Sequence, residues 1–171
     1  MKKPDIIIVD DHQIFRKGIK SIITLENIAN VIGEASNGEE FIELLSHLKP
    51  DIVLLDIDMP VMNGLEATEK ALKIMPDLKI IAFTLFGDEE YFIRMIELGA
   101  MGYILKSADI SELEKALNYI MKGEKYFSNH QFRKNGNRLG NKEIQKLYHH
   151  ENHENHSSKN KGTGDLFPPW F

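Results

Sequence analysis

The chain of 171 residues contains no cysteine, so disulfide bonds and thiol chemistry are excluded. No apolar stretch approaches the roughly 20 residues that span a bilayer. Positive charge is not in excess either: the net charge is −5, which offers no global basic field for nucleic acid. With 42% hydrophobic and 27% charged residues, the composition is ordinary for a globular protein. The expected protein is soluble and cytoplasmic, with no membrane association.

Short apolar runs alternate with amphipathic stretches along most of the chain. The runs typical of strands occupy residues 5–11, 31–35, 51–56, 78–84 and 102–106. The stretches typical of helices occupy residues 12–26, 37–48, 64–75, 88–100 and 109–123. In the first of these, Phe15, Ile19, Ile22 and Ile23 share the face that is expected to point inward. Five strand–helix pairs in strict alternation predict an α/β fold, with a parallel sheet covered by helices on both faces.

The composition changes near residue 127, where asparagine, histidine, lysine and glycine become frequent. We therefore predict a domain over 1–125 and an atypical linker or tail over 126–171, with a short helix near 139–148. The tail carries four closely spaced histidines, which are His149, His150, His153 and His156. Their spacing permits a Zn²⁺ or Ni²⁺ site, but a solvated polar tail is the favoured interpretation.

Polar side chains stand at the carboxyl ends of four of the five predicted strands. Asp10 and Asp11 follow the first strand and Asp56 ends the third. Thr84 ends the fourth strand and Lys106 the fifth. Because ligands of a parallel α/β sheet bind outside the carboxyl ends of its strands, we expect these side chains to converge.

The chemistry that such a set supports is narrow. Three carboxylates with no nearby histidine or cysteine favour a hard divalent cation, Mg²⁺ first and otherwise Mn²⁺. Asp11 and Asp56 are candidates for direct ligands, with Asp10 reaching the ion through water. Lys106 supplies a compact positive charge for phosphate oxygens, and Thr84 supplies a hydroxyl donor. Asp56 is then the candidate nucleophile that accepts a phosphoryl group as an acyl phosphate.

The segments "IIIVDDH", "VLLDIDMPVMNG", "IIAFT" and "GYILKS" resemble the receiver domain of two-component response regulators. The resemblance covers roughly residues 3–123, and the stretch from "ELGAMGYILKS" onward resembles the NarL/LuxR-type subfamily. It implies a flavodoxin-like (CheY-like) fold with five strands in the order 2-1-3-4-5. It also implies that Asp56 accepts phosphate from a sensor histidine kinase in a Mg²⁺-dependent reaction.

The same resemblance assigns roles to individual residues. Mg²⁺ would be held by Asp11, Asp56 and the backbone carbonyl of Asp58, with Asp10 assisting. Thr84 and Tyr103 would form the switch pair, in which the hydroxyl moves to the phosphoryl group and the ring turns inward. Such a protein is not an enzyme in the usual sense, since it catalyses its own phosphotransfer and slow autodephosphorylation. The switch would then control homodimerisation or a partner protein.

Two alternatives remain at this stage. A NarL/LuxR-type regulator carries a helix-turn-helix output domain, but after residue 127 only "LGNKEIQKLY" faintly resembles part of one. Transcription regulation through DNA therefore depends on whether this missing or degenerate segment functions. The second alternative is an aspartate-nucleophile phosphatase, because "LLDIDMP" also resembles the D-x-D loop of haloacid-dehalogenase-type enzymes. Turnover of an external phosphomonoester would distinguish the phosphatase from a receiver.

Overall fold

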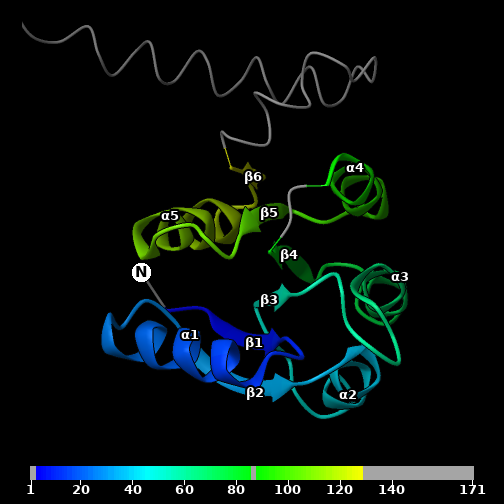
Figure 1. Ribbon diagram of the computed structural model, residues 1–171, viewed down its shortest axis with the longest axis horizontal. Coiled ribbons are helices and arrows are strands. Elements are labelled where there is room, and N and C mark those ends of the chain that lie inside the picture. Colours follow the sequence, from blue (N-terminus) through cyan, green and yellow to red (C-terminus); the bar gives the residue numbers. More distant parts are fainter. Residues whose placement is uncertain (1–2, 86–87, 129–171) are drawn as a thin grey trace, which may run out of the picture. The chain divides into compact units, whose positions relative to one another are not determined.

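A computed structural model describes residues 3–85 and 88–128 of the chain. All neighbouring strands pair in parallel in one sheet of order β2-β1-β3-β4-β5-β6 (Figure 1). The strands are β1 (Asp5–Val9), β2 (Asn30–Ala35), β3 (Ile52–Leu55), β4 (Lys79–Thr84), β5 (Gly102–Leu105) and β6 (Tyr126–Phe127). The helices are α1 (Gln13–Leu25), α2 (Gly38–Leu44), α3 (Gly64–Ile74), α4 (Glu89–Leu98) and α5 (Ile110–Met121). Helices α1 and α5 cover one face, and α2, α3 and α4 cover the other.

The predicted α/β class and the strand order 2-1-3-4-5 are confirmed, and the structure adds a sixth strand. The two residues of β6 pair with Gly102 and Tyr103 at the open edge of β5. A strand of two residues is too short to show an alternation of apolar and polar residues, so these residues were predicted to belong to the tail. The compact unit that contains it runs to Ser128. The boundary predicted at 125/126 stays a prediction, and the helix expected over 139–148 lies outside the described residues.

The sheet is buried on both faces, as an α/β fold requires. All four residues of β3 are buried, and β1 has one partly exposed residue at its start. Under α1 and α5, the core contains isoleucines from the central strands together with Ile23, Leu113 and Leu117. Ile22, which was expected to point inward, is 44% exposed. It lines the groove between α1 and α5 together with Phe15 and Ile19, so the shared face is as predicted although Ile22 is partly open to solvent.

Helix caps fix the loops that join strands to helices. The side chains of Asn37, Asn63 and Asp109 each accept a hydrogen bond from the backbone N–H three residues onward. Asp88 caps α4 by accepting from the backbone N–H of Glu90, two residues onward, and Gly99 ends that helix with φ of 105°. None of the described helices is long and apolar enough to cross a membrane.

Candidate functional site

The strand ends bring the predicted polar residues together. The backbone N–H of Asp56 donates to the carbonyl of Val9 (2.9 Å), which ties the end of β3 to the end of β1. The N–H of Lys106 donates to the carbonyl of Thr84 (2.8 Å), which ties the end of β5 to the end of β4. Asp10 and Asp56 are only 2% and 3% exposed. The sheet therefore buries two carboxylates at one edge, where isolated charges are costly.

Lys106 is the cation that makes this burial tolerable. Its Nζ lies 2.7 Å from Oδ2 of Asp10 and 2.6 Å from Oδ2 of Asp56, and its side chain is 1% exposed. The same Nζ lies 4.9 Å from the centre of the Phe15 ring, a cation–π contact. The lysine is therefore held at a fixed point between the two carboxylates, and its contact with phosphate oxygens stays a prediction.

The environment of Asp56 is dominated by its burial. Its Oδ1 accepts a hydrogen bond from the backbone N–H of Ile57 (2.7 Å), while Oδ2 faces Lys106. Burial raises the pKa of the Asp56 carboxyl, and the bonds from Lys106 lower it only in part. The neighbouring Asp10 charge raises the pKa further. A raised pKa marks a carboxylate whose charge is poorly compensated in the metal-free protein.

This raised pKa has a consequence for stability. The native protein binds the Asp56 proton more tightly than the unfolded chain, so native stability falls as the pH rises from 3.8 through the raised value. In metal-free buffer at pH 7, we expect Asp56→Asn to raise the free energy of unfolding by about 1 kcal/mol. The gain should shrink as the pH is lowered through that window. Urea unfolding of wild type and Asp56→Asn at several pH values measures this difference in the free energy of unfolding. A difference that does not vary with pH would contradict the account.

Asp11 supplies the observation that tests whether a divalent cation fits. It lies just outside β1 and is partly exposed, but its Oδ1 is buried and, apart from an ion-pair contact with His12 Nδ1 at 3.0 Å, has no partner among the described side chains. Oδ2 of Asp10 is also without a hydrogen bond, although it is ion-paired with Lys106. Oxygen atoms of this kind are the ligands that Mg²⁺ prefers. The donor set therefore fits the hard cation that the sequence predicted.

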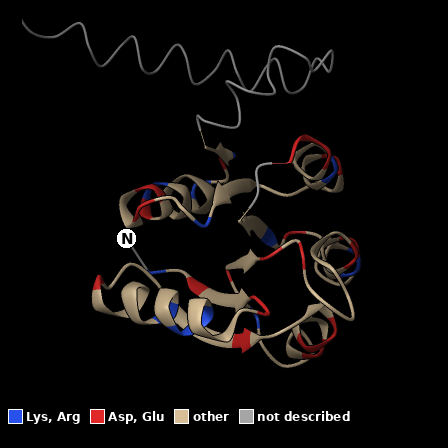
Figure 2. Cartoon of the chain, in the orientation of Figure 1, with Lys and Arg blue, Asp and Glu red and all other residues tan. Residues whose placement is uncertain are grey.

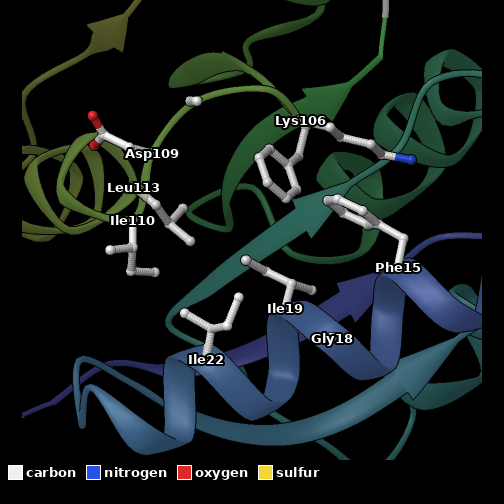
Figure 3. Close-up of a pocket in the computed structure, with 10 residues that line it drawn as sticks. Phe15, Gly18, Ile19, Ile22, Lys106, Asp109, Ile110 and Leu113 are labelled. Carbon is white, nitrogen blue, oxygen red and sulfur yellow. The ribbon is translucent and has the colours of Figure 1, made fainter.

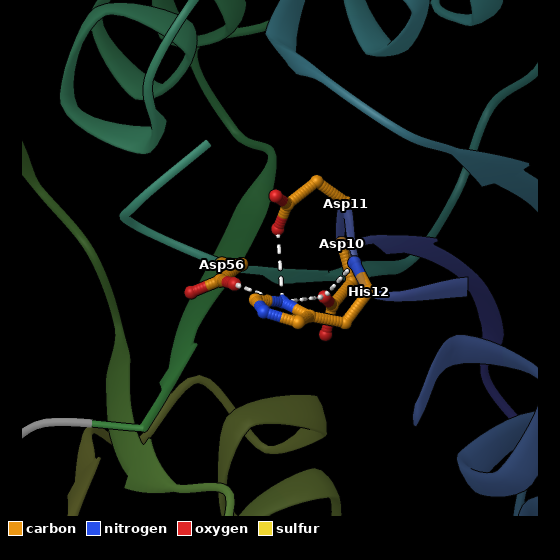
Figure 4. Close-up of side chains that lie close together, drawn as sticks. All are labelled: Asp10, Asp11, His12 and Asp56. Atoms are coloured by element: carbon orange, nitrogen blue, oxygen red, sulfur yellow. Dashed lines mark hydrogen bonds and ion pairs between the residues drawn. The ribbon is translucent and has the colours of Figure 1, made fainter. Parts of the chain in front are cut away.

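His12 was expected to be a loop or first-turn residue, and it is the N-cap residue of α1, but the contact of its ring with these carboxylates was not predicted. Its Nδ1 lies 3.0 Å from Oδ1 of Asp11 and 3.2 Å from Oδ1 of Asp10. The same nitrogen lies 3.9 Å from Oδ2 of Asp56, and Figure 4 shows it facing all three carboxylates. The position of His12 directly after the acidic pair was the only signal available, and its side-chain direction cannot be read from sequence.

Thr84 and Tyr103, the predicted switch pair, lie on neighbouring strands. Thr84 is 4% exposed at the end of β4, beside the start of the Lys106 loop. Tyr103 is fully buried, and its ring packs edge-on against Phe92 of α4 with 5.1 Å between centroids. The ring therefore already points inward in this structure. Movement of either side chain on phosphorylation stays a prediction.

The loop after β3 carries Asp58 and ends at Gly64. The side chain of Asp58 is exposed, which agrees with a role for its backbone carbonyl only, and that role stays a prediction. The N–H of Gly64 donates to the carbonyl of Ile57 (2.8 Å), which folds the loop back under the site. Val61, at the tip, is exposed and has φ of 69°, a conformation that β-branched residues rarely adopt. The loop is thus shaped tightly around the end of β3.

An apolar groove of about 210 Å³ borders the site between α1 and the start of α5 (Figure 3). Its walls include Phe15, Ile19 and Ile22 of α1 and Leu113 of α5, and Lys106 lies at one end. Helix α1 also carries basic residues and no acidic one, whereas α2 carries three glutamates (Figure 2). The surface beside Asp56 is therefore apolar and locally basic.

Comparison with known proteins identifies the class. The family model of the response regulator receiver domain matches residues 6–118, so the chain belongs to this family. It is the receiver domain of a two-component response regulator, related to NarL/LuxR-type DNA-binding regulators. The receiver family also accounts for a candidate nucleophile directly after β3 and an acidic pair directly after β1, whereas the phosphatase alternative expects the nucleophile loop on the first strand.

Several relatives illustrate this class. The transcriptional regulatory protein DegU of Brevibacillus brevis is 38% identical over 124 residues, which are 72% of this chain and 52% of that protein. The nitrate/nitrite response regulator NarL of Escherichia coli K12 is 41% identical over 123 residues, 72% of this chain and 57% of that protein. A LuxR-family response regulator from Aurantimonas sp. SI85-9A1 superposes with a TM-score of 0.73 at 31% identity, covering 77% of this chain and 94% of that one. The chain spans little more than half the length of these curated relatives.

Proposed function

We propose that Asp56 accepts a phosphoryl group from a sensor histidine kinase in a Mg²⁺-dependent reaction. The observation that carries the proposal is the position of Asp56, which is buried at the end of β3 with Lys106 Nζ 2.6 Å from one oxygen. A buried, poorly compensated carboxylate beside a fixed cation is suited to become an acyl phosphate. The phosphoryl oxygens can then take the lysine contact that the carboxylate now holds.

The reaction is a simple displacement. A carboxylate oxygen of Asp56 attacks phosphorus and the bond to the donor's imidazole nitrogen breaks, leaving a neutral imidazole on the donor once a proton is taken up. Lys106 neutralises charge on the transferred group, and the hydroxyl of Thr84, at the end of the adjacent strand β4, is the proposed donor to it. Asp11, Asp56 and the backbone carbonyl of Asp58 are the proposed Mg²⁺ ligands, with Asp10 assisting. When bound, Mg²⁺ neutralises the carboxylates and the incoming phosphate.

A protein donor fits the surface beside the site. Ile14, at the start of α1, is 90% exposed, and the groove behind it is apolar. A small phosphodonor does not need such a surface, whereas a kinase that presents a phosphohistidine on a folded domain does. The kinase is therefore proposed to dock on α1 and the neighbouring loops, with its phosphohistidine above Asp56.

The proposed output is a change in the surface formed by α4, β5 and α5, controlled by Thr84 and Tyr103. That surface would select homodimerisation or a partner protein. RcsB of Salmonella typhimurium, a structural neighbour at 27% identity, has been solved as dimers bound to DNA. Regulation of transcription through DNA is proposed for this chain only if residues 129–171, which lie outside the described part, supply the contacts.

The test is intact-protein mass after incubation with Mg²⁺ and acetyl phosphate. We expect wild type to gain the mass of one phosphoryl group, and Asp56→Asn to gain none. Omitting Mg²⁺ should prevent the gain, because nothing else neutralises the carboxylates and the incoming phosphate together. A gain retained in Asp56→Asn would overturn the assignment. Steady turnover of an external phosphomonoester would favour a phosphatase instead.

A further inference from the structure

The imidazole of His12 lies where a cation ligand would lie. In an octahedral complex with bonds of about 2.1 Å, neighbouring donor atoms are about 3.0 Å apart and opposite ones about 4.2 Å. The nitrogen-to-oxygen distances from His12 Nδ1 are 3.0, 3.2 and 3.9 Å, within that range. Donor atoms of all four residues, Asp10, Asp11, His12 and Asp56, lie within 4.8 Å of one another. An ion that contacts the carboxylates can therefore also contact this nitrogen.

The backbone holds His12 in this place. Its N–H donates to Oδ1 of Asp10 (2.9 Å), and its carbonyl accepts from the N–H of Arg16 (2.9 Å). His12 is the N-cap residue of α1, but its side chain makes no capping hydrogen bond. The ring is therefore not explained by helix capping, which is the ordinary use of a polar residue at this position.

Lys106 and His12 approach the carboxylate oxygens from two different sides. Lys106 contacts Oδ2 of Asp10 and Oδ2 of Asp56 from inside the sheet edge. His12 faces Oδ1 of Asp10 and Oδ1 of Asp11 from the solvent side, with a side chain that is 54% exposed. The buried Oδ1 of Asp11, which accepts no hydrogen bond, lies on the His12 side. A metal ion bound through Oδ1 of Asp10 and Oδ1 of Asp11 does not have to displace Lys106, although it would share Oδ2 of Asp56 with the lysine.

We propose that His12 is a nitrogen ligand that makes this site select first-row transition-metal ions over Mg²⁺. Imidazole suits Co²⁺, Ni²⁺ and Zn²⁺, whereas Mg²⁺ prefers oxygen donors and keeps several waters. When Mg²⁺ binds, the exposed ring is free to turn toward solvent, so His12 contributes little to that ion. When a transition-metal ion binds, the ring adds a fourth protein ligand. This inference rests on the divalent-cation site proposed above and goes beyond it by naming the residue that sets its metal preference.

The test is a Co²⁺ titration of the full chain, followed by visible absorption, with Mg²⁺ affinity measured by calorimetry. The tail histidines would bind Co²⁺ themselves, so every protein in the series carries glutamine at 149, 150, 153 and 156. His12→Ala should weaken Co²⁺ binding at least about tenfold and shift the absorption bands, while Mg²⁺ affinity stays unchanged. His47→Ala is the matched control, because His47 is exposed and its ring forms a hydrogen bond with the neighbouring Ser46 hydroxyl, away from the carboxylates of the site.

A further variant separates failure of this inference from failure of the proposed function. Asp11→Asn should weaken the binding of both Co²⁺ and Mg²⁺. If Asp11→Asn weakens both but His12→Ala binds Co²⁺ as tightly as its parent, the metal site stands and the role of His12 is overturned. If neither substitution changes the binding of either ion, the cation site itself is overturned. Excess Mg²⁺ should also displace Co²⁺ from the parent protein, and failure to do so would place Co²⁺ elsewhere.

Discussion

Lys106→Met is expected to lower the free energy of unfolding at neutral pH by about 3 kcal/mol and to slow phosphorylation by acetyl phosphate about 100-fold. Methionine keeps the length and the apolar contacts of the lysine stem but removes the charge. Asp10 and Asp56, each almost fully buried, would then have lost the ammonium that lies within 2.7 Å of both. Breaking a buried ion pair from one side leaves an uncompensated charge, and that charge is the source of the loss.

The matched control is Lys73→Met. Lys73 pairs with Glu69 one turn earlier on α3 (2.6 Å), but both side chains are more than half exposed. Such a pair contributes well under about 1 kcal/mol, so its loss should barely change the urea midpoint. Adding Asp10→Asn to Lys106→Met should restore part of the stability, because it removes one of the two unpaired charges. If Lys106→Met unfolds at the same urea concentration as Lys73→Met, the lysine does not hold the carboxylates as described.

Gly64→Ala is the second large effect, and its cause is steric. A Cβ at position 64 would overlap the backbone carbonyl oxygen of Asp56 and lie 2.7 Å from Cα of Ile57. Both obstacles are backbone atoms at the end of β3, so no side chain can rotate away to relieve the overlap. Overpacking ordinarily costs about 1–3 kcal/mol, and a clash with backbone belongs at the upper end. We expect the thermal midpoint to fall by about 10 °C, and phosphorylation to slow because Asp56 is displaced.

Gly18→Ala provides the control for this substitution. Gly18 lies within α1, and a Cβ there would meet no atom within 4 Å. Alanine in an exposed helix is favoured over glycine by about 0.5–1 kcal/mol, so this variant should be slightly more stable than wild type. Equal thermal midpoints for Gly64→Ala and Gly18→Ala would contradict the account, because they would show that the loop after β3 accommodates a Cβ at position 64.

The sequence predicted most of the fold because its signals were local and consistent. Short apolar runs, each followed by an amphipathic stretch, leave few arrangements for a parallel sheet. The exposure of Ile22 and the presence of β6 were not predicted, and both have the same physical origin. Ile22 lies at the edge of a helical stripe, and the Tyr126–Phe127 strand exists only because β5 has an open edge. Both depend on the packing of neighbouring elements, which cannot be read from the hydrophobic periodicity of the sequence.

The residues of the candidate site also fall into those that local sequence signals could locate and those that depend on tertiary contacts. Asp10, Asp56, Thr84 and Lys106 follow strands directly, so the direction of a parallel sheet was enough to bring them together. His12 could not be placed this way, because its ring direction depends on the backbone of the loop after β1. The inward position of the Tyr103 ring depends on Phe92 of α4 and Phe127 of β6, which pack against each other at 5.8 Å. These are tertiary contacts between residues far apart in the chain.

The central claim is that Asp56 itself carries the phosphoryl group, and chemical trapping tests it most directly. Wild type is incubated with Mg²⁺ and acetyl phosphate and then reduced with borohydride, which converts an aspartyl phosphate to homoserine. Peptide mass analysis should find homoserine at position 56 and aspartate at positions 10, 11 and 58. Homoserine at any of those other positions, or a phosphorylated peptide that contains His12 and no homoserine at 56, would contradict the account.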